Sequence, residues 1–184
     1  MIRDVAAKLK PFKAPGPDGI PNAVLKECIE SIIHHVYYIF RAILELRVYP
    51  DSWKHFTTAV LRKPGKPDYS VPKAYRPIAL MNTIAKLFTS LLAGFLSHLC
   101  EFRNLLPCNQ FGGRPGRMTT DSLHLLTCKI KEAWRNGKVA TSLSLDVQGA
   151  FPNVVKEVLL HNMRLKGVPV VCTDIIELRN TVFK

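Results

Sequence analysis

The chain has 184 residues, of which 47% are hydrophobic, so it can bury a core and is not a disordered tail. Lysine and arginine total 26 against 14 acidic residues, giving a formal net charge of +12, which favours a polyanionic partner, nucleic acid ahead of a membrane. Because the basic residues are dispersed, the pattern favours a folded surface with several phosphate contacts over a basic tail; a merely basic soluble domain is the alternative.

Cysteine usage and the apolar segments predict the compartment. The five cysteines form no Cys-x-x-Cys pair, and an odd number leaves one unpaired in any disulfide scheme. These features predict a reducing, intracellular compartment, with nucleus and cytoplasm both open. The first residues lack the apolar core of a signal peptide. The most apolar segment, residues 84–96, is short and carries Lys86 and Ser90, so no membrane partner is expected.

The N-terminal third predicts a rigid loop followed by a long helix. Residues 13–22, KAPGPDGIPN, hold three prolines and two glycines around Asp18, which is typical of an irregular loop. Apolar residues then recur at helical spacing from Leu25 to Ile43, which predicts an amphipathic helical run that ends before Pro50.

A basic β-hairpin is predicted next. Residues 57–61, TTAVL, are β-prone. Residues 62–77 then hold five basic residues and four prolines before the chain returns through YRPIAL, which indicates a hairpin with a flexible tip that could close over phosphates. A solvated loop whose lysines face water is the alternative.

Two further helices flank a glycine-rich loop. Asn82 or Thr83 can cap a helix that runs to Leu99 with one apolar stripe, typical of a core helix. Residues 110–121, QFGGRPGRMTTD, combine three glycines with two arginines and lead into a helix over 122–136, which Gly137 ends. Such a loop at a helix N-terminus can hold a nucleic-acid backbone, although any capped helix start looks similar.

An alternating segment that ends in an acid follows. Apolar residues set among small polar neighbours predict a half-buried strand from Val139 to Asp146, and Gly149 breaks the pattern. Asp146 is its only carboxylate, so it can bind Mg²⁺, or simply cap the turn. Helices are expected over 154–166 and 170–183.

In chain order, the motifs KAPGPDGIP, RKPGKP…KAYRPIAL, QFGGRPGR and SLDVQGAFPNV closely resemble the fingers and palm motifs of reverse transcriptases (RNA-directed DNA polymerases) of non-LTR, LINE-like retrotransposons. The likeness covers nearly the whole chain. It implies an α+β fold, a partial right-hand polymerase. Residues 1–138 would form helical fingers with a β-hairpin, and residues 139–184 the start of the palm with the first strand of its antiparallel sheet. The first and third motifs favour a retrotransposon over a group II intron or telomerase-like enzyme.

The resemblance implies roles for the palm residues. Asp146 matches the first catalytic aspartate, which binds Mg²⁺ together with the backbone carbonyl of Val147 during two-metal nucleotidyl transfer. Phe151 matches the aromatic gate that lies beneath the incoming sugar. Its ring would crowd a 2′-hydroxyl and so favour deoxynucleotides over ribonucleotides.

The fingers residues match contacts to nucleotide and template. Arg76, with Lys63 or Lys66, matches the hairpin cations that hold the triphosphate, where arginine offers a bidentate fork and lysine a mobile point charge. Three further residues match a motif near the template and incoming nucleotide: Gln110, Arg114 and Arg117. The implied partners are an RNA template, a DNA primer and a dNTP.

The chain also departs from the family pattern. Pro152 stands where the family commonly has a second acid, and the chain reads Gly112-Gly113-Arg114 where the family commonly reads GFR. The Y-x-D-D motif that supplies the other two carboxylates does not occur in these 184 residues. We therefore expect a fragment or degenerate copy that is inactive alone. A non-enzymatic basic RNA-binding module is the alternative.

Overall fold

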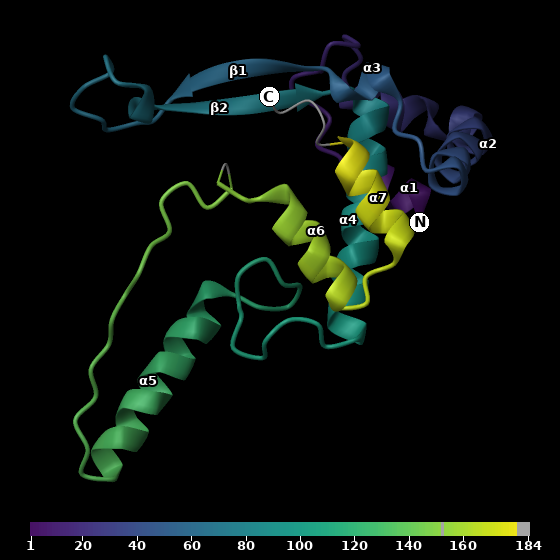
Figure 1. Cartoon of the computed structure of the whole chain (residues 1–184). Coiled ribbons are helices and arrows are strands. Elements are labelled where there is room, and N and C mark those ends of the chain that lie inside the picture. The colour runs from purple at the N-terminus through teal and green to yellow at the C-terminus, as the bar shows by residue number, and fades with distance from the viewer. Residues whose placement is uncertain (152, 180–184) are drawn as a thin grey trace. The chain divides into compact units, whose positions relative to one another are not determined.

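The structure is a computed structural model that describes residues 1–151 and 153–179. The elements, labelled in Figure 1, are α1 (Ile2–Lys8), α2 (Asn22–Leu46), α3 (Asp51–Lys54), β1 (Phe56–Arg62), a short 3-10 turn (Pro72–Ala74), β2 (Tyr75–Met81), α4 (Thr83–Phe102), α5 (Thr119–Arg135), α6 (Lys156–Leu165) and α7 (Val170–Arg179). They form two compact units. The first contains residues 1–94 and the described residues from 167 onward, and the second contains residues 95–166.

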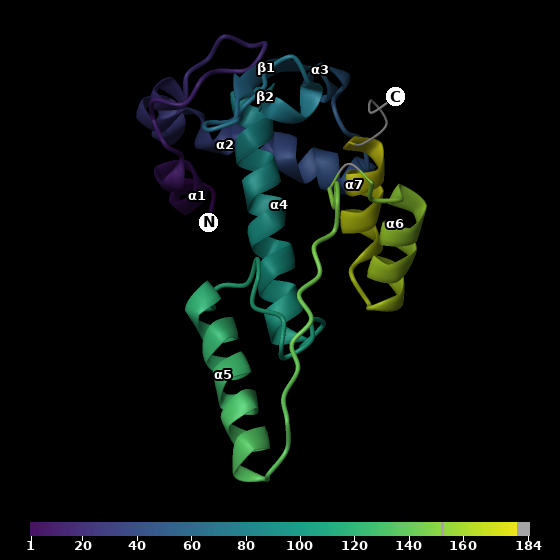
Figure 2. The ribbon, with the colours of Figure 1, turned by 90° about the vertical axis from the view of Figure 1, so that its left-hand side faces the viewer.

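The core of the first unit is built on helix α2. Its apolar face buries Leu25, Ile29, Val36, Phe40 and Ile43, which recur every three, four or seven residues as one side of a helix requires. This face packs with buried residues of the first half of α4 and with Ile175 of α7. Figure 2 shows α2 crossing α4, with α7 beside them.

Four aromatic rings fill the centre of this core. Phe40 lies 5.1 Å from Phe88 and 6.3 Å from Trp53, and Tyr49 lies 5.9 Å from Trp53, measured between ring centroids. The rings meet edge to face or tilted, the arrangements that aromatic quadrupoles favour. The cluster joins α2 to α4 at the point where the hairpin leaves the helices.

The sheet has two antiparallel strands, β1 and β2, which pair from Phe56 opposite Met81 to Arg62 opposite Tyr75. The predicted hairpin is therefore confirmed, one residue longer at each end of its first strand than the β-prone run indicated. In Figure 1 the hairpin extends away from the helices of its own unit. Its strands are mostly exposed, so its position depends on the residues at its base.

The second unit holds the end of α4, a long loop, α5, an extended segment and α6. Helix α5 begins three residues earlier and ends one residue earlier than the helix predicted over 122–136. Gly137 follows its end with a φ of +64°, the left-handed conformation that glycine adopts without strain. No residue of α5 is buried, whereas α6 buries Leu160. Several large apolar side chains of α5, among them Leu123, Leu126 and Trp134, are therefore exposed.

Helix α4 alone among the described helices is long and apolar enough, by length and composition, to cross a membrane. In the first unit its residues Leu87, Phe88 and Leu91 are buried in the core. The core of a protein can therefore account for its apolar character, as the sequence predicted for this stripe.

The predicted strand over residues 139–146 is wrong in this structure. Residues 138–147 form neither helix nor strand, and Val139 is 92% exposed. A strand is held by ladder hydrogen bonds to a neighbour, and β1 and β2, which form the sheet of the described residues, pair with each other. The alternating pattern is present, but the partner strand is not. The predicted boundary between fingers and palm at residue 138 stays a prediction, since the compact units divide at other residues.

The two helices predicted after this segment are present as α6 and α7. Helix α6 begins two residues later than expected, and α7 begins at the predicted residue. The last part of the second prediction, residues 180–183, lies outside the described residues.

Candidate nucleic-acid interface

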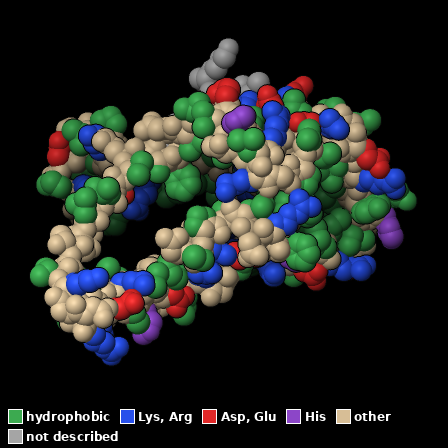
Figure 3. Space-filling view, turned by 60° about the horizontal axis from the view of Figure 1, so that its bottom comes forward, with side chains coloured by type: hydrophobic (Ala, Val, Ile, Leu, Met, Phe, Trp, Pro, Cys, Tyr) green, Lys and Arg blue, Asp and Glu red, His purple; other side chains and the backbone are tan. Residues whose placement is uncertain are grey.

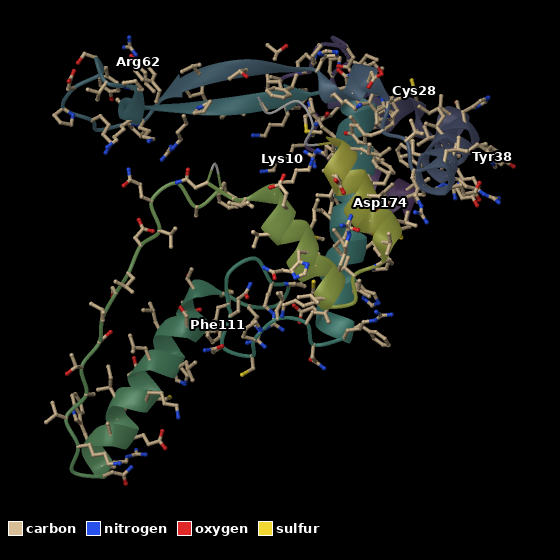
Figure 4. All side chains as sticks on the ribbon, in the orientation of Figure 1. Lys10, Cys28, Tyr38, Arg62, Phe111 and Asp174 are labelled. Carbon is tan, nitrogen blue, oxygen red and sulfur yellow. The ribbon has the colours of Figure 1, made fainter. Side chains whose placement is uncertain are left out.

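The end of the hairpin is a closed, internally bonded loop over residues 63–74. The Lys63 backbone N–H donates to the Ala74 carbonyl at 2.8 Å, which continues the strand ladder by one bond. The Tyr69 hydroxyl donates to the Lys63 carbonyl at 2.8 Å, and the Tyr75 hydroxyl donates to the Tyr69 carbonyl at 2.9 Å. The Arg62 guanidinium lies 5.4 Å from the centre of the Tyr69 ring, a cation–π contact. Figure 4 shows Arg62 at this end of the hairpin.

Positive charge dominates this loop. Its one acidic residue, Asp68, accepts hydrogen bonds from the backbone N–H and the hydroxyl of Ser70, both at 2.7 Å. These bonds hold the pKa of the Asp68 carboxyl below its ordinary value, so it stays ionised and is engaged within the loop. The loop still has a net positive charge, because this one carboxylate offsets only one of its three lysines, Lys63, Lys66 and Lys73. Over the visible face in Figure 3, lysine and arginine side chains are scattered rather than gathered in one patch.

The candidate triphosphate-binding cations differ in whether their side chains form hydrogen bonds within the structure. The Lys63 ammonium donates to the Lys73 carbonyl at 2.7 Å, so it closes the loop. Lys66 and Arg76 are exposed, and neither side chain has a hydrogen-bond partner within the described residues. The geometry therefore favours Lys66 over Lys63 as the lysine that joins Arg76 in holding an anion.

In the second unit, Arg114 is held by the loop that contains it. Its guanidinium forms a two-pronged ion pair with Glu101, at 2.8 and 2.7 Å, and donates to the carbonyls of Pro107 at 2.7 Å and Gln110 at 3.4 Å. Its side chain is only 5% exposed. Hydrogen bonding to this guanidinium holds the pKa of the Glu101 carboxyl below its ordinary value. Arg114 thus ties the loop to α4, which leaves little of it free for a template contact.

The other two residues of this motif also make contacts within the loop. Arg117 donates to the Cys108 carbonyl at 2.7 Å and lies 5.4 Å from the centre of the Phe111 ring. The Gln110 amide reaches the Gly112 carbonyl at 3.4 Å, close to the limit for a hydrogen bond, and is exposed. Gln110 and the exposed part of Arg117 are therefore the positions of this motif that a nucleic acid could reach.

The Glu101–Arg114 pair makes the loop sensitive to pH. Because the folded-state pKa of Glu101 is lowered, the pair stabilises the loop above the ordinary glutamate value of about 4.3. This stabilisation is lost as the pH falls below that value and through the folded-state pKa. Thermal unfolding measured from pH 7 to pH 3.5 should show wild type more stable than Glu101→Gln at neutral pH, with the gap closing at the acid end. A gap that is constant across this range would contradict the prediction.

The three candidate palm residues lie in or beside the extended segment. Asp146 is exposed, Val147 follows it, and Phe151 is 93% exposed. Among residues 1–151 and 153–179, no three His, Cys, Asp or Glu side chains lie close enough together to hold a metal ion. Pro152, the departure from the family pattern, lies outside the described residues.

Residues that the sequence did not single out organise these loops. Glu101 and the two tyrosines of the hairpin have partners 6 to 13 residues away. Asp18, which the sequence places in an irregular loop, accepts a hydrogen bond from the start of α4. A proline-rich loop around one acid is a weak signal, and its partner 65 residues later leaves no local pattern.

Comparison with known proteins identifies the class. The sequence pattern of the family described as reverse transcriptase (RNA-dependent DNA polymerase) matches residues 61–181, from the hairpin through α7. The chain therefore belongs to the reverse transcriptase family, as the ordered motifs predicted. Members of this family generally use a divalent metal ion, and the family implies a nucleic-acid template and primer.

Three of the relatives are polymerases of mobile elements from Drosophila melanogaster. A probable RNA-directed DNA polymerase from transposon BS is 35% identical over 152 residues, which cover 83% of this chain and 17% of the relative. The corresponding protein from transposon X-element is 35% identical over 153 residues, with the same two shares. The RNA-directed DNA polymerase from mobile element jockey is 28% identical over 163 residues, 89% of this chain and 18% of the relative. The chain thus spans about a sixth of the length of these relatives.

Proposed function

We propose that this chain forms the fingers and the start of the palm of a right-hand RNA-directed DNA polymerase of a non-LTR retrotransposon. Residues 1–138 act as fingers. The segment from 139 supplies the first palm strand when it pairs with a strand outside the described residues. Family membership supports this role, as do the apolar side chains that alternate along the unpaired segment, of which Leu143 and Leu145 are more than 80% exposed.

The observation that carries the proposal is the projecting hairpin, on which the side chains of Lys66 and Arg76 have no hydrogen-bond partner among the described residues. Lys66 and Arg76 are exposed, while Lys63, Tyr69 and Tyr75 are used to hold the loop in shape. A loop already held in one conformation loses little entropy when it binds an anion. Lys66 and Arg76 would then contact the triphosphate or the phosphates of a nucleic acid, and Gln110 with Arg117 the template.

At the palm, the donors suit Mg²⁺ but are too few for two-metal catalysis. The Asp146 carboxylate and the Val147 carbonyl are oxygen ligands of the kind that Mg²⁺ prefers. Two-metal transfer requires further carboxylates, and among the described residues Asp146 belongs to no group of three or more side chains that could hold a metal ion. We therefore propose these two groups as ligands to one ion, and Phe151 as the ring that faces the sugar of a bound dNTP.

RNA binding by the 184-residue chain tests the nucleic-acid role. We expect the affinity for a single-stranded RNA, measured by filter binding, to fall steeply with salt, with a slope of log K against log [salt] of about −0.7 per phosphate bound. The double variant Lys66→Ala/Arg76→Ala should weaken binding and make the slope shallower by about 0.7 for each phosphate that the variant no longer binds.

The matched control is Lys10→Ala, which removes one positive charge from an exposed residue in a different part of the same unit. It should change the affinity for RNA far less than the double variant Lys66→Ala/Arg76→Ala does. Binding that is absent or independent of salt would overturn the nucleic-acid role. Because one carboxylate cannot assemble the metal pair, we expect the chain to bind RNA without extending a primer on it, and metal-dependent DNA synthesis would contradict that expectation.

A further inference from the structure

The proline-rich loop of residues 13–21 reaches the base of the hairpin, far from it in sequence. Gly16 packs directly against the backbone of Met81 and Asn82, where β2 ends and α4 begins. A Cβ atom at Gly16 would lie closer to the Met81 carbonyl than the 3.0 Å that real Cβ atoms keep. Glycine is therefore required here by close approach of two backbones.

Asp18, two residues later, bonds to the first residue of α4. One of its carboxylate oxygens accepts the Thr83 backbone N–H at 2.6 Å, and the other accepts the Ile20 N–H at 3.3 Å. The Thr83 hydroxyl in turn donates to the Ile20 carbonyl at 2.5 Å, and Thr83 is fully buried. The first N–H groups of a helix lack partners within it, and a negative charge at that end also suits the helix dipole. Asp18 thus caps α4 from 65 residues away.

Two more bonds close the same junction. The Lys86 ammonium donates to the Ala14 carbonyl at 3.2 Å, which ties the first turns of α4 to the loop. The Asn82 amide donates to the Ser52 carbonyl at 2.9 Å, which links the end of β2 to α3, just before β1. Both strands of the hairpin are therefore fixed where they leave the helices.

We propose that Asp18 is a positioning residue that sets the direction of the hairpin and so places Lys66 and Arg76. The hairpin is a two-stranded sheet that is anchored at its base and mostly exposed along its length. A seven-residue strand spans about 20 Å. A tilt of about 10° at the base therefore moves the far end by roughly 3 to 4 Å, more than a phosphate contact tolerates.

The bonds of Asp18 to Thr83 and Ile20 are called the Asp18 lock below. Amide hydrogen exchange of the whole chain tests this lock independently of RNA binding. Asp18→Ala should speed exchange in a peptide that covers residues 78–86 by at least tenfold, while Asp18→Asn, which keeps an acceptor oxygen but no charge, should fall in between. Ile29→Val, a core substitution far from the junction in sequence, controls for general loss of stability and should leave this peptide slow. Exchange that is equal in Asp18→Ala and wild type would overturn the lock.

A double-mutant cycle tests positioning, and this part rests on the proposed RNA role. Lys66→Ala/Arg76→Ala should weaken RNA binding at least threefold less in the Asp18→Ala background than in wild type, because the cations there are already misplaced. In the Ile29→Val background the loss should match wild type. If the effects of Asp18→Ala and of Lys66→Ala/Arg76→Ala on the free energy of RNA binding are additive, the positioning role of Asp18 is overturned. If the wild-type chain does not bind RNA, both the proposed function and the positioning of RNA-binding cations are refuted. The hydrogen-exchange experiment would still show whether Asp18 holds the base of the hairpin.

Discussion

Replacing Phe88 with alanine is expected to lower the free energy of unfolding of the first unit by about 3–5 kcal/mol. Phe88 is 3% exposed and lies within 6.4 Å of the rings of Phe40, Tyr49 and Trp53, measured between centroids. Its removal leaves a cavity where α2 meets α4 and breaks three aromatic contacts at once. Urea unfolding followed by tryptophan fluorescence measures the change in stability, because Trp53 belongs to this cluster.

The matched control is the same substitution at Phe12, which is 96% exposed in the same unit. An exposed ring with so little buried surface should change the stability by no more than about 0.5 kcal/mol. Equal destabilisation at Phe12 and Phe88 would show that the aromatic cluster does not stabilise the core. A destabilised Phe88 variant that keeps the hairpin ladder protected from exchange would show that the hairpin is held without this core.

The helices and the hairpin could be predicted because their signals are local. The three-to-four-residue recurrence of Val36, Phe40 and Ile43 identifies one face of a helix, and the structure places that face in the core. A β-prone run, a proline-rich turn and a second run likewise define the hairpin within about 25 residues. In each case the pattern that identifies the element lies within the element itself, although residues distant in sequence complete its packing.

The segment around Asp146 shows where a local pattern is insufficient. Alternation predicts which residues would share a face if a strand forms, but a strand also needs a neighbour to receive its hydrogen bonds. Residues 138–147 have none among the described residues and remain extended and exposed. The motif therefore identifies the candidate palm residues Asp146, Val147 and Phe151. Their arrangement in space depends on a neighbouring strand, which the sequence pattern does not specify.

The contacts that organise the loops could not be predicted for a different reason. Arg114 is a predicted template contact because it matches a family motif near the template, yet its partner Glu101 lies at the end of the preceding helix. Nothing in the spacing of the two residues distinguishes an internal ion pair from an exposed cation. The same holds for Asp18, whose partner Thr83 is fixed only when the loop folds against α4. The motifs thus select charged residues, but only the folded loops separate those that hold the structure from those that are free to bind.

Gly16→Ala is expected to destabilise the first unit by about 1–3 kcal/mol or more, although it adds a single methyl group. The new Cβ would overlap the Met81 carbonyl, and a backbone group cannot rotate away as the end of a flexible side chain can. The loop and the end of β2 must separate, which also lengthens the bond from Asp18 to Thr83. Thermal unfolding measures the change in stability, and exchange of residues 78–86 locates it at the junction.

Gly94→Ala is the matched control, because the substitution is identical and the residue lies in α4 of the same unit with nothing within 4 Å of its added Cβ. In a helix interior alanine is favoured over glycine by about 0.5–1 kcal/mol, so this variant should be more stable than wild type. If Gly16→Ala lowers the stability and Gly94→Ala raises it, the effect of close packing at the hairpin base is separated from the effect of helix propensity. A stabilising Gly16→Ala would mean that the loop does not press against Met81 in solution, and the lock at Asp18 would then lose its structural basis.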